Sequence, residues 1–345
     1  MVNERYEFIR HINTGGQGSV SLYSDKYLDR EVAVKTILSN QNSNIIKEVD
    51  LLESVCSKHV VNLYDVIQTN SQVDIYLEYL GGDDLRDKAG NCTFDEFLSL
   101  AYQLATGLAD IHVSGICHRD IKLENAKFDT QGVLKIFDFG VSRIGNQHST
   151  MNGFGTVQYL APECYELITN DSVELTFAVD IYALGVTFHK LIFNDFCDFH
   201  GKLGHPETKI KFNTLNFSQE LSDLLNSTLE LKPEDRPTAL QLKLNLEREL
   251  LKSKHIGLFA SSNKTHFIDK NNPCTLIKFR DNLFITIKYN LSDFIIINVM
   301  GSIYINNNPA IIGNILPEAC VLTFELTQRE RFFVSFSSSH PELVL

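Results

Sequence analysis

The stretch that decides the fold runs from His118 to Gly140 and reads HRDIKLENAKFDTQGVLKIFDFG. It places two acidic side chains, Asp120 and Asp138, on either side of Asn125. Phosphoryl transfer needs an oxygen acceptor that orients the attacking hydroxyl, oxygen ligands for Mg²⁺, and a cation near the transferred phosphate. Asp120 suits the first role and Lys122 the third, while Asn125 and Asp138 supply metal-binding oxygens. The stretch therefore predicts a site for phosphoryl transfer.

The order of these residues, HRDxKxxN followed by DFG, resembles the catalytic and metal-binding loops of eukaryotic-type protein kinases. Lys122, two residues after Asp120, is similar to the serine/threonine branch of that family. The resemblance covers residues 1 to about 252 and implies an α+β class, the bilobal protein kinase fold with a β-rich N-lobe and a helical C-lobe. We therefore predict a kinase domain over residues 1–254 and a second domain over residues 255–345.

A glycine cluster near the N-terminus has the pattern of a phosphate-binding loop. Strand-like alternation over residues 6–37 is interrupted by NTGGQGSV at residues 13–20. Glycine lets a backbone approach a phosphate closely and offers N–H donors without a side chain in the way. Such a cluster alone is an ordinary hairpin turn, but VAVK follows it, and together they resemble the kinase glycine-rich loop and its strand lysine. The resemblance implies that these residues bind ATP: Asn13, Gly15, Gly16, Gly18, Val20, Ala33 and Lys35.

A short helical pattern at residues 45–52 supplies a partner for Lys35. In the family, this lysine pairs with a helix glutamate, and the pair positions the nucleotide phosphates as part of the catalytic machinery. Glu48 suits that role because Leu52, four residues on, shares its inward face. Asp50 and Glu53 remain alternatives, as does a surface position for Glu48.

The run LEYLGG at residues 77–82 resembles the hinge between the kinase lobes. The resemblance implies that backbone groups of Glu78 and Leu80 bind the adenine edge of ATP. It also implies that Leu77 occupies the gatekeeper position, while Val20 and Ala33 pack over the ring.

Two residues depart from the family pattern. Asn13 stands where the glycine-rich loop has its first glycine, and asparagine tolerates unusual backbone angles better than most residues. Lys127 stands where the family places an apolar side chain beneath adenine. Its aliphatic stem can cover an apolar surface while its ammonium reaches solvent, or it weakens nucleotide binding or alters nucleotide choice. These departures motivate the alternative of a pseudokinase scaffold that binds nucleotide or partners without turnover.

The segment after DFG is rich in Gly, Ser, Thr and Asn and ends in GTVQYLAPE at residues 155–163. It resembles the activation segment of the family, in which Arg119 would pair with a phosphorylated hydroxyl and order the loop. Ser149 and Thr150 are the candidate phosphorylation sites. Thr156 is instead expected to contact the catalytic Asp and Lys.

Four further residues match positions with structural or substrate-binding roles in the family. Glu163 and Arg236 resemble the partners of a buried ion pair that fixes geometry. Asp180 resembles a buried acid that holds the backbone of the catalytic loop. Glu124 matches a position that often meets a basic residue upstream of the target hydroxyl, which implies basic protein substrates.

The composition argues against several other classes of function. The net charge is −12 and the pI about 5.4, so no overall basic field favours nucleic acid. The N-terminus lacks the apolar core of a signal peptide, and no run of roughly 18 apolar residues predicts a membrane span. The seven cysteines form no CxxC pair, which indicates neither a disulfide framework nor a zinc site. We expect reduced thiols in an intracellular, cytoplasmic protein.

Beyond about residue 255 the sequence changes to short apolar or alternating runs. Two of these runs flank Asp281-Asn282 in hairpin fashion. The runs predict strands at residues 275–280, 284–289, 294–299, 302–305, 320–326 and 331–336. About 90 residues of short strands predict a small all-β sandwich or barrel, which we assign to no family. Its expected role is autoregulation of the kinase domain or partner binding, with a stabilising appendage as the alternative.

The residues and the resemblance together imply an ATP- and Mg²⁺-dependent serine/threonine protein kinase that acts on a protein substrate. Asp120 would orient the substrate hydroxyl and accept its proton, and Lys122 would stabilise charge on the γ-phosphate. Asn125 and Asp138 would hold the metal.

Overall fold

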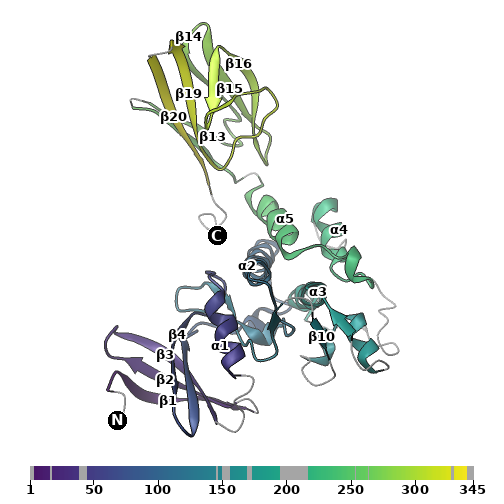
Figure 1. The fold of residues 1–345 in the computed structure, drawn as a ribbon. Helices are drawn as coiled ribbons and strands as arrows, with labels where there is room; N and C mark the ends of the chain where they lie inside the picture. The colour runs from purple at the N-terminus through teal and green to yellow at the C-terminus, as the bar shows by residue number, and fades with distance from the viewer. Residues whose placement is uncertain are drawn as a thin grey trace. The chain divides into compact units, whose positions relative to one another are not determined.

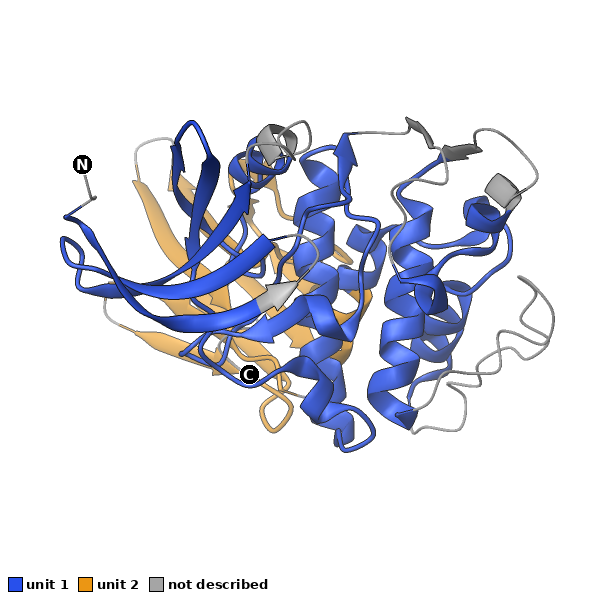
Figure 2. Cartoon of the chain, turned by 90° about the horizontal axis from the view of Figure 1, so that it is seen from below, with its two compact units in different colours: residues 1–244 blue, residues 245–345 orange. Residues whose placement is uncertain are grey.

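The computed structural model describes residues 4–15, 18–38, 45–144, 147–149, 156–168, 173–194, 217–252, 254–262, 264–327 and 330–339. The chain divides into two compact units, residues 1–244 and 245–345, and each has buried hydrophobic clusters of its own (Figure 2). The division falls inside helix α5 (Ala239–Leu251), about ten residues before the domain boundary that the sequence predicts.

A five-stranded antiparallel sheet opens the first unit, in the order β1-β2-β3-β5-β4 (Figure 1). The strands are β1 (Tyr6–Gly15), β2 (Gly18–Asp25), β3 (Arg30–Leu38), β4 (Leu63–Gln68) and β5 (Gln72–Glu78). Successive side chains of a strand point to opposite faces, so Val32 and Val34 of β3 join one buried cluster and Ile37 joins another. Helix α1 (Ile45–Ser54) packs Val49 against the cluster of Ile37, and Lys35 therefore faces this helix.

Four helices follow in the described part of the first unit. They are α2 (Phe94–Val113), α3 (Ala178–Phe193), α4 (Gln219–Ser227) and the start of α5. Helix α2 begins with a capping box, in which Thr93 and Glu96 each bind the other's backbone N–H, and it is buried around most of its circumference. In the described part of the chain, every helix is too short or too polar to cross a membrane.

Short strand pairs hold the two loops of the His118–Gly140 stretch beside each other. Strand β6 (Ile116–Cys117) pairs with β9 (Arg143–Ile144), and β7 (Ala126–Phe128) pairs with β8 (Leu134–Ile136). The first loop connects β6 to β7 and the second connects β8 to β9. Both loops therefore start and end on the same two ladders, which fixes Asp120 and Asp138 near each other.

The second unit is all-β after α5. One sheet has the order β13-β12-β20-β19-β17-β18 and the other β14-β15-β16. The strands are β12 (Gly257–Ala260), β13 (Thr265–Ile268), β14 (Cys274–Arg280), β15 (Leu283–Tyr289), β16 (Phe294–Met300), β17 (Ser302–Ile305), β18 (Asn308–Pro309), β19 (Ala319–Thr327) and β20 (Glu330–Ser338). Alternate residues of both sheets, such as Phe259, Ile285 and Phe324, form one buried core. The expected mixture of strands and helices in the first unit and the all-β second region are both confirmed.

Candidate active site

A buried carboxylate holds the backbone of the loop that carries Asp120. Asp180 of α3 is fully buried and accepts hydrogen bonds from the backbone N–H groups of His118 and Arg119, each at 2.7 Å. His112 Nε2 lies 3.0 Å from the same carboxylate. Burial acts to raise the pKa of Asp180, but the hydrogen bond and charge of His112 and the bonded N–H groups outweigh it, so this pKa lies below its ordinary value. Arg119 has a φ of 68°, which non-glycine residues rarely adopt, and Asp180 stabilises that turn.

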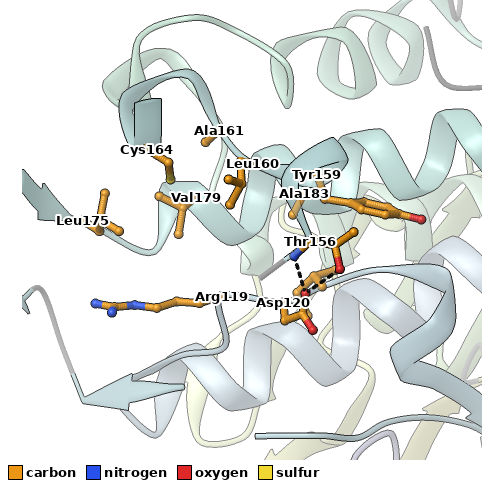
Figure 3. Close-up of a pocket in the computed structure, with 11 residues that line it drawn as sticks. Arg119, Asp120, Thr156, Tyr159, Leu160, Ala161, Cys164, Leu175, Val179 and Ala183 are labelled. Carbon is orange, nitrogen blue, oxygen red and sulfur yellow. Dashed lines mark hydrogen bonds between the residues drawn. The ribbon is translucent and has the colours of Figure 1, made fainter. Parts of the chain in front are cut away.

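Asp120 lies at the centre of a small hydrogen-bond network. Its Oδ2 accepts from Lys122 Nζ and from Asn125 Nδ2, both at 2.7 Å. Its Oδ1 accepts from the backbone N–H of Thr156 at 3.0 Å (Figure 3). Lys122 Nζ also donates to the Thr156 hydroxyl at 2.7 Å, so the contacts predicted for Thr156 are confirmed. Burial acts to raise the pKa of Asp120, but Lys122 and the other donors bring it below its ordinary value, which keeps the carboxylate ionised at neutral pH.

Lys35 lies between two carboxylates. Its Nζ is 2.7 Å from Glu48 Oε1 and 3.6 Å from Asp138 Oδ1. The structure thus selects Glu48 among the three acids that the sequence offers on α1. The side chains of Lys35 and Glu48 are almost wholly buried, and Asp138 is about a third exposed. Asp138 has a φ of 67°, an uncommon conformation for a non-glycine residue, and its carboxylate lines the cleft described next.

A cleft of about 600 Å³ lies beneath the five-stranded sheet and reaches Asp138. The structure brings these predicted residues together in its lining: Asn13, Gly18, Val20, Ala33, Lys35, Glu48, Leu77, Glu78, Leu80, Asn125, Lys127 and Asp138. Asp120 and Lys122 are not among the described residues of this lining, only the backbone of Gly15 is described, as the end of β1, and Gly16 lies outside the described residues. The volume is in the range of small-molecule sites. Apolar walls, a buried ammonium and two oxygen-bearing side chains suit a nucleotide triphosphate with Mg²⁺.

In the segment predicted to form the hinge, the backbone and side chain of Glu78 already have partners. Its N–H donates to the carbonyl of Asn62 at 2.9 Å, and its carboxylate lies 3.0 Å from Lys135 Nζ. Asn62 Nδ2 also donates to that carboxylate at 2.8 Å. These contacts hold the end of β5 against β8. The Glu78 N–H already donates to Asn62.

Lys127 lies on β7, directly opposite Lys135 on β8. Its side chain lines the cleft, while its Nζ lies 3.8 Å from Asp84 Oδ1. The backbones of Asp84 and Lys127 also form a β-bridge. The ammonium is thereby drawn toward Asp84 and the stem is left in the cleft lining. The sequence did not lead us to Asp84 and Arg86 as residues that line the cleft. The acidic pair Asp83-Asp84, directly after Gly81-Gly82, is a sequence signal for Asp84.

A second, much smaller cavity of about 20 Å³ lies on the other side of Asp120 (Figure 3). Its lining includes Arg119, Thr156 and Cys164. Burial raises the pKa of the Cys164 thiol to about 12, so the thiol stays protonated and is a poor nucleophile. Arg119 is buried, and its Nε and Nη2 have no hydrogen-bond partner within the described ranges.

The remaining predicted residues of this region lie as follows. Arg236 binds Glu163 with two hydrogen bonds, at 2.7 and 2.8 Å, so the predicted ion pair is confirmed. Strand β10 (Gln147–Ser149) pairs with β11 (Val173–Leu175), which fixes the backbone of Ser149. Thr150 lies outside the described residues.

Comparison with known proteins agrees with this geometry. A family model for the protein kinase domain matches residues 6–245. A putative serine/threonine-protein kinase of Saccharomyces cerevisiae is 30% identical over 246 residues, which are 69% of this chain and 27% of the yeast protein. A serine/threonine-protein kinase of Arabidopsis thaliana is 32% identical over 198 residues, 55% of this chain and 54% of the relative. The ovarian-specific serine/threonine-protein kinase Lok of Drosophila melanogaster is 28% identical over 270 residues, 69% of this chain and 55% of the relative.

This chain spans less than two thirds of the length of each of these relatives. The family match nevertheless covers well over half of the chain, and every residue of the cleft and of the Asp120 network lies inside it. The chain therefore belongs to the protein kinase domain family.

Proposed function

We propose that this protein transfers the γ-phosphate of ATP to serine or threonine hydroxyls of protein substrates. One observation carries the proposal: Lys122 and Asn125 both donate hydrogen bonds to Asp120 beside a cleft in which Lys35 joins Glu48 to Asp138. These are the groups that phosphoryl transfer requires. The names of the serine/threonine kinases that resemble this chain support the same reaction.

In the proposed reaction, the Asp120 carboxylate accepts a hydrogen bond from the substrate hydroxyl and takes its proton. The hydroxyl oxygen bonds to the γ-phosphorus as the bond to the β-phosphate oxygen breaks, and ADP leaves. The Lys122 ammonium lies 2.7 Å from Asp120, where it stabilises negative charge on the transferred group. Asn125 and Asp138 would hold Mg²⁺, which neutralises charge on the phosphates, and the Lys35–Glu48 pair positions them.

The proposed fold divides the kinase domain into two lobes around this site, with the sheet and α1 in the N-lobe. Residues 1–254 form the kinase domain in this proposal, and Leu77, Glu78 and Leu80 form the hinge that holds adenine. Phosphorylation at Ser149 or Thr150 would bring a phosphate to Arg119, whose buried guanidinium supports an anion site.

The direct test of the proposed function is transfer of labelled phosphate from ATP to serine and threonine peptides by the purified chain. We expect transfer that requires Mg²⁺ and stops when the metal is chelated. Nucleotide binding without any transfer to peptides or to the chain itself would instead support the pseudokinase scaffold.

Lys127 gives a test of the nucleotide site. Lys127→Met keeps the aliphatic stem, so we expect the KM for ATP to change by less than about threefold. Lys127→Glu puts a negative charge in the lining of the cleft, and its repulsion of the ATP phosphates should raise the KM about tenfold, which corresponds to about 1.4 kcal/mol. Steady-state kinetics at varied ATP measure both. Lys88→Met is the control, because it removes an exposed lysine that also lies near a carboxylate, that of Glu96. Equal increases in the KM for ATP with both Lys127 variants would mean that the aliphatic stem contributes nothing to the surface beneath adenine.

We also propose that residues 255–345 form a domain that regulates the kinase or binds a partner. Its core is closed and separate from the clusters of the first unit, which supports a domain with its own function. Deletion of residues 256–345 should raise the rate of peptide phosphorylation if the domain is autoinhibitory, or leave the rate unchanged and remove a bound partner. A lower unfolding temperature with unchanged activity and partners would indicate a stabilising appendage.

A further inference from the structure

Glu124, Tyr159 and Lys190 form a second contact set beside that of Asp120. The Tyr159 hydroxyl donates to Glu124 Oε2 at 3.2 Å. Lys190 Nζ lies 3.6 Å from Glu124 Oε1 and donates to the Tyr159 hydroxyl at 3.5 Å. The three side chains come from three segments, because Glu124 is in the catalytic loop, Tyr159 in the 3-10 turn Val157–Tyr159, and Lys190 in α3.

This set lies next to the point of phosphate transfer. Two hydrogen bonds join the catalytic loop to the segment that begins at Thr156. The N–H of Thr156 donates to Asp120, and the hydroxyl of Tyr159 donates to Glu124. Figure 3 shows Tyr159 close to Thr156, with its hydroxyl directed away from Asp120. An extended peptide advances about 3.3 Å per residue, so residues a few positions from an acceptor held at Asp120 would pass Glu124.

The charges of this set cancel. The Glu124 side chain is 34% exposed and would by itself attract an arginine or lysine of a substrate, whereas Lys190 is 17% exposed and directs its ammonium at that carboxylate. Burial and the charge of Glu124 raise the pKa of Tyr159, which therefore stays a neutral donor. The result is an acid that is already paired from within the protein.

We propose that Lys190 is a specificity-determining residue that neutralises Glu124, so that this kinase accepts substrates without a preference for basic residues near the acceptor. The proposal rests on the proposed function, since it concerns the peptide side of that site. It differs from the expectation that the sequence gives for Glu124, in which a substrate arginine or lysine takes the place that the ammonium of Lys190 holds here.

The test uses serine peptides that carry one Arg or one Ala at each of the three positions on either side of the serine. Peptide affinity is measured by fluorescence anisotropy and turnover by label transfer, for the full chain and for Lys190→Met, Glu124→Gln and the double variant. We expect the wild type to bind and phosphorylate Arg and Ala peptides within about twofold of each other. Lys190→Met should favour Arg peptides about tenfold, which corresponds to about 1.4 kcal/mol for a new charge-assisted contact.

The double variant should return the ratio to that of the wild type, because it lacks both charges. Lys88→Met is the matched control, since that lysine lies 4.0 Å from Glu96 and lines neither cavity. A tenfold preference of the wild type for Arg peptides overturns the proposal without any variant. An unchanged ratio in a folded Lys190→Met also overturns it. Binding without turnover in all variants would end the proposed function, while the anisotropy ratios still decide the role of Lys190.

Discussion

Replacing Asp120 with asparagine is expected to lower kcat for peptide phosphorylation by about 10²- to 10⁴-fold, the usual contribution of a positioned general base. Asparagine keeps the shape of the side chain but cannot take the proton of the attacking hydroxyl. The N–H₂ group of the asparagine would also face a hydrogen-bond donor and could not accept from it, because Lys122 Nζ and the N–H of Thr156 donate to the two carboxylate oxygens of Asp120. Asp120 does not line the cleft that we propose binds ATP, so the dissociation constant for ATP should change by less than about threefold.

Single-turnover label transfer and ATP titration separate these two effects. Asp223→Asn is the control, since Asp223 is an exposed residue of α4 that accepts only a local hydrogen bond from Gln219 among the contacts described. An Asp120→Asn variant with at least a third of the wild-type kcat would show that transfer does not use this carboxylate. A wild type that binds ATP yet transfers nothing would favour the scaffold.

Replacing Asp180 with asparagine is expected to lower the free energy of unfolding of the first unit by about 3 kcal/mol. The carboxylate accepts from two backbone N–H groups and lies against His112, whereas asparagine offers one oxygen and turns an N–H₂ group toward a donor. At least one buried N–H would lose its partner. Because the chain has no tryptophan, hydrogen exchange followed by mass spectrometry is the suitable measurement. Protection should fall in residues 112–125 and stay unchanged in β14 to β16 of the second unit.

Acid should remove the difference in the free energy of unfolding between the wild type and Asp180→Asn. The folded-state pKa of Asp180 lies below its ordinary value, so the carboxylate contributes its full stability above about pH 4 and loses it as the pH falls further. The stability gap between wild type and Asp180→Asn should therefore close below about pH 4. A second group titrates nearer to neutral pH. Burial lowers the pKa of His118 in the folded state, so the stability that its neutral form contributes is present above about pH 6.5 and is lost as the pH falls below that value. A gap that stays constant down to pH 2 would contradict the assigned charge on Asp180.

The family resemblance together with helical spacing predicted one ion pair of the site. The resemblance implied that Lys35 pairs with an acid of the following helix, and the spacing favoured Glu48 over Asp50 and Glu53; the ammonium and the Glu48 carboxylate lie 2.7 Å apart. Short apolar runs also predicted β14, β15, β16, β17, β19 and β20 of the second unit, but not β12, β13 or β18. The pairing of the strands was not predictable from such runs, because β12 lies beside β20, the other end of the region, and no turn connects them directly. A hairpin can be read from adjacent residues, whereas a pairing of distant strands depends on closure of the whole core.

The sequence alone determined which residues we propose as the catalytic set, since Asp120, Lys122, Asn125 and Asp138 lie in a fixed order within one stretch that resembles the kinase loops. The tertiary structure was needed for the ion pairs to which no family pattern points. Lys127 lies by Asp84 and Lys190 by Glu124, and each pair joins segments that no local pattern relates. An ion pair depends on a separation of a few ångströms, because the attraction falls with distance and is screened by water. That separation is set by how the segments pack, so the sequence identified the charges of Lys127 and Lys190 but not the acids that they meet.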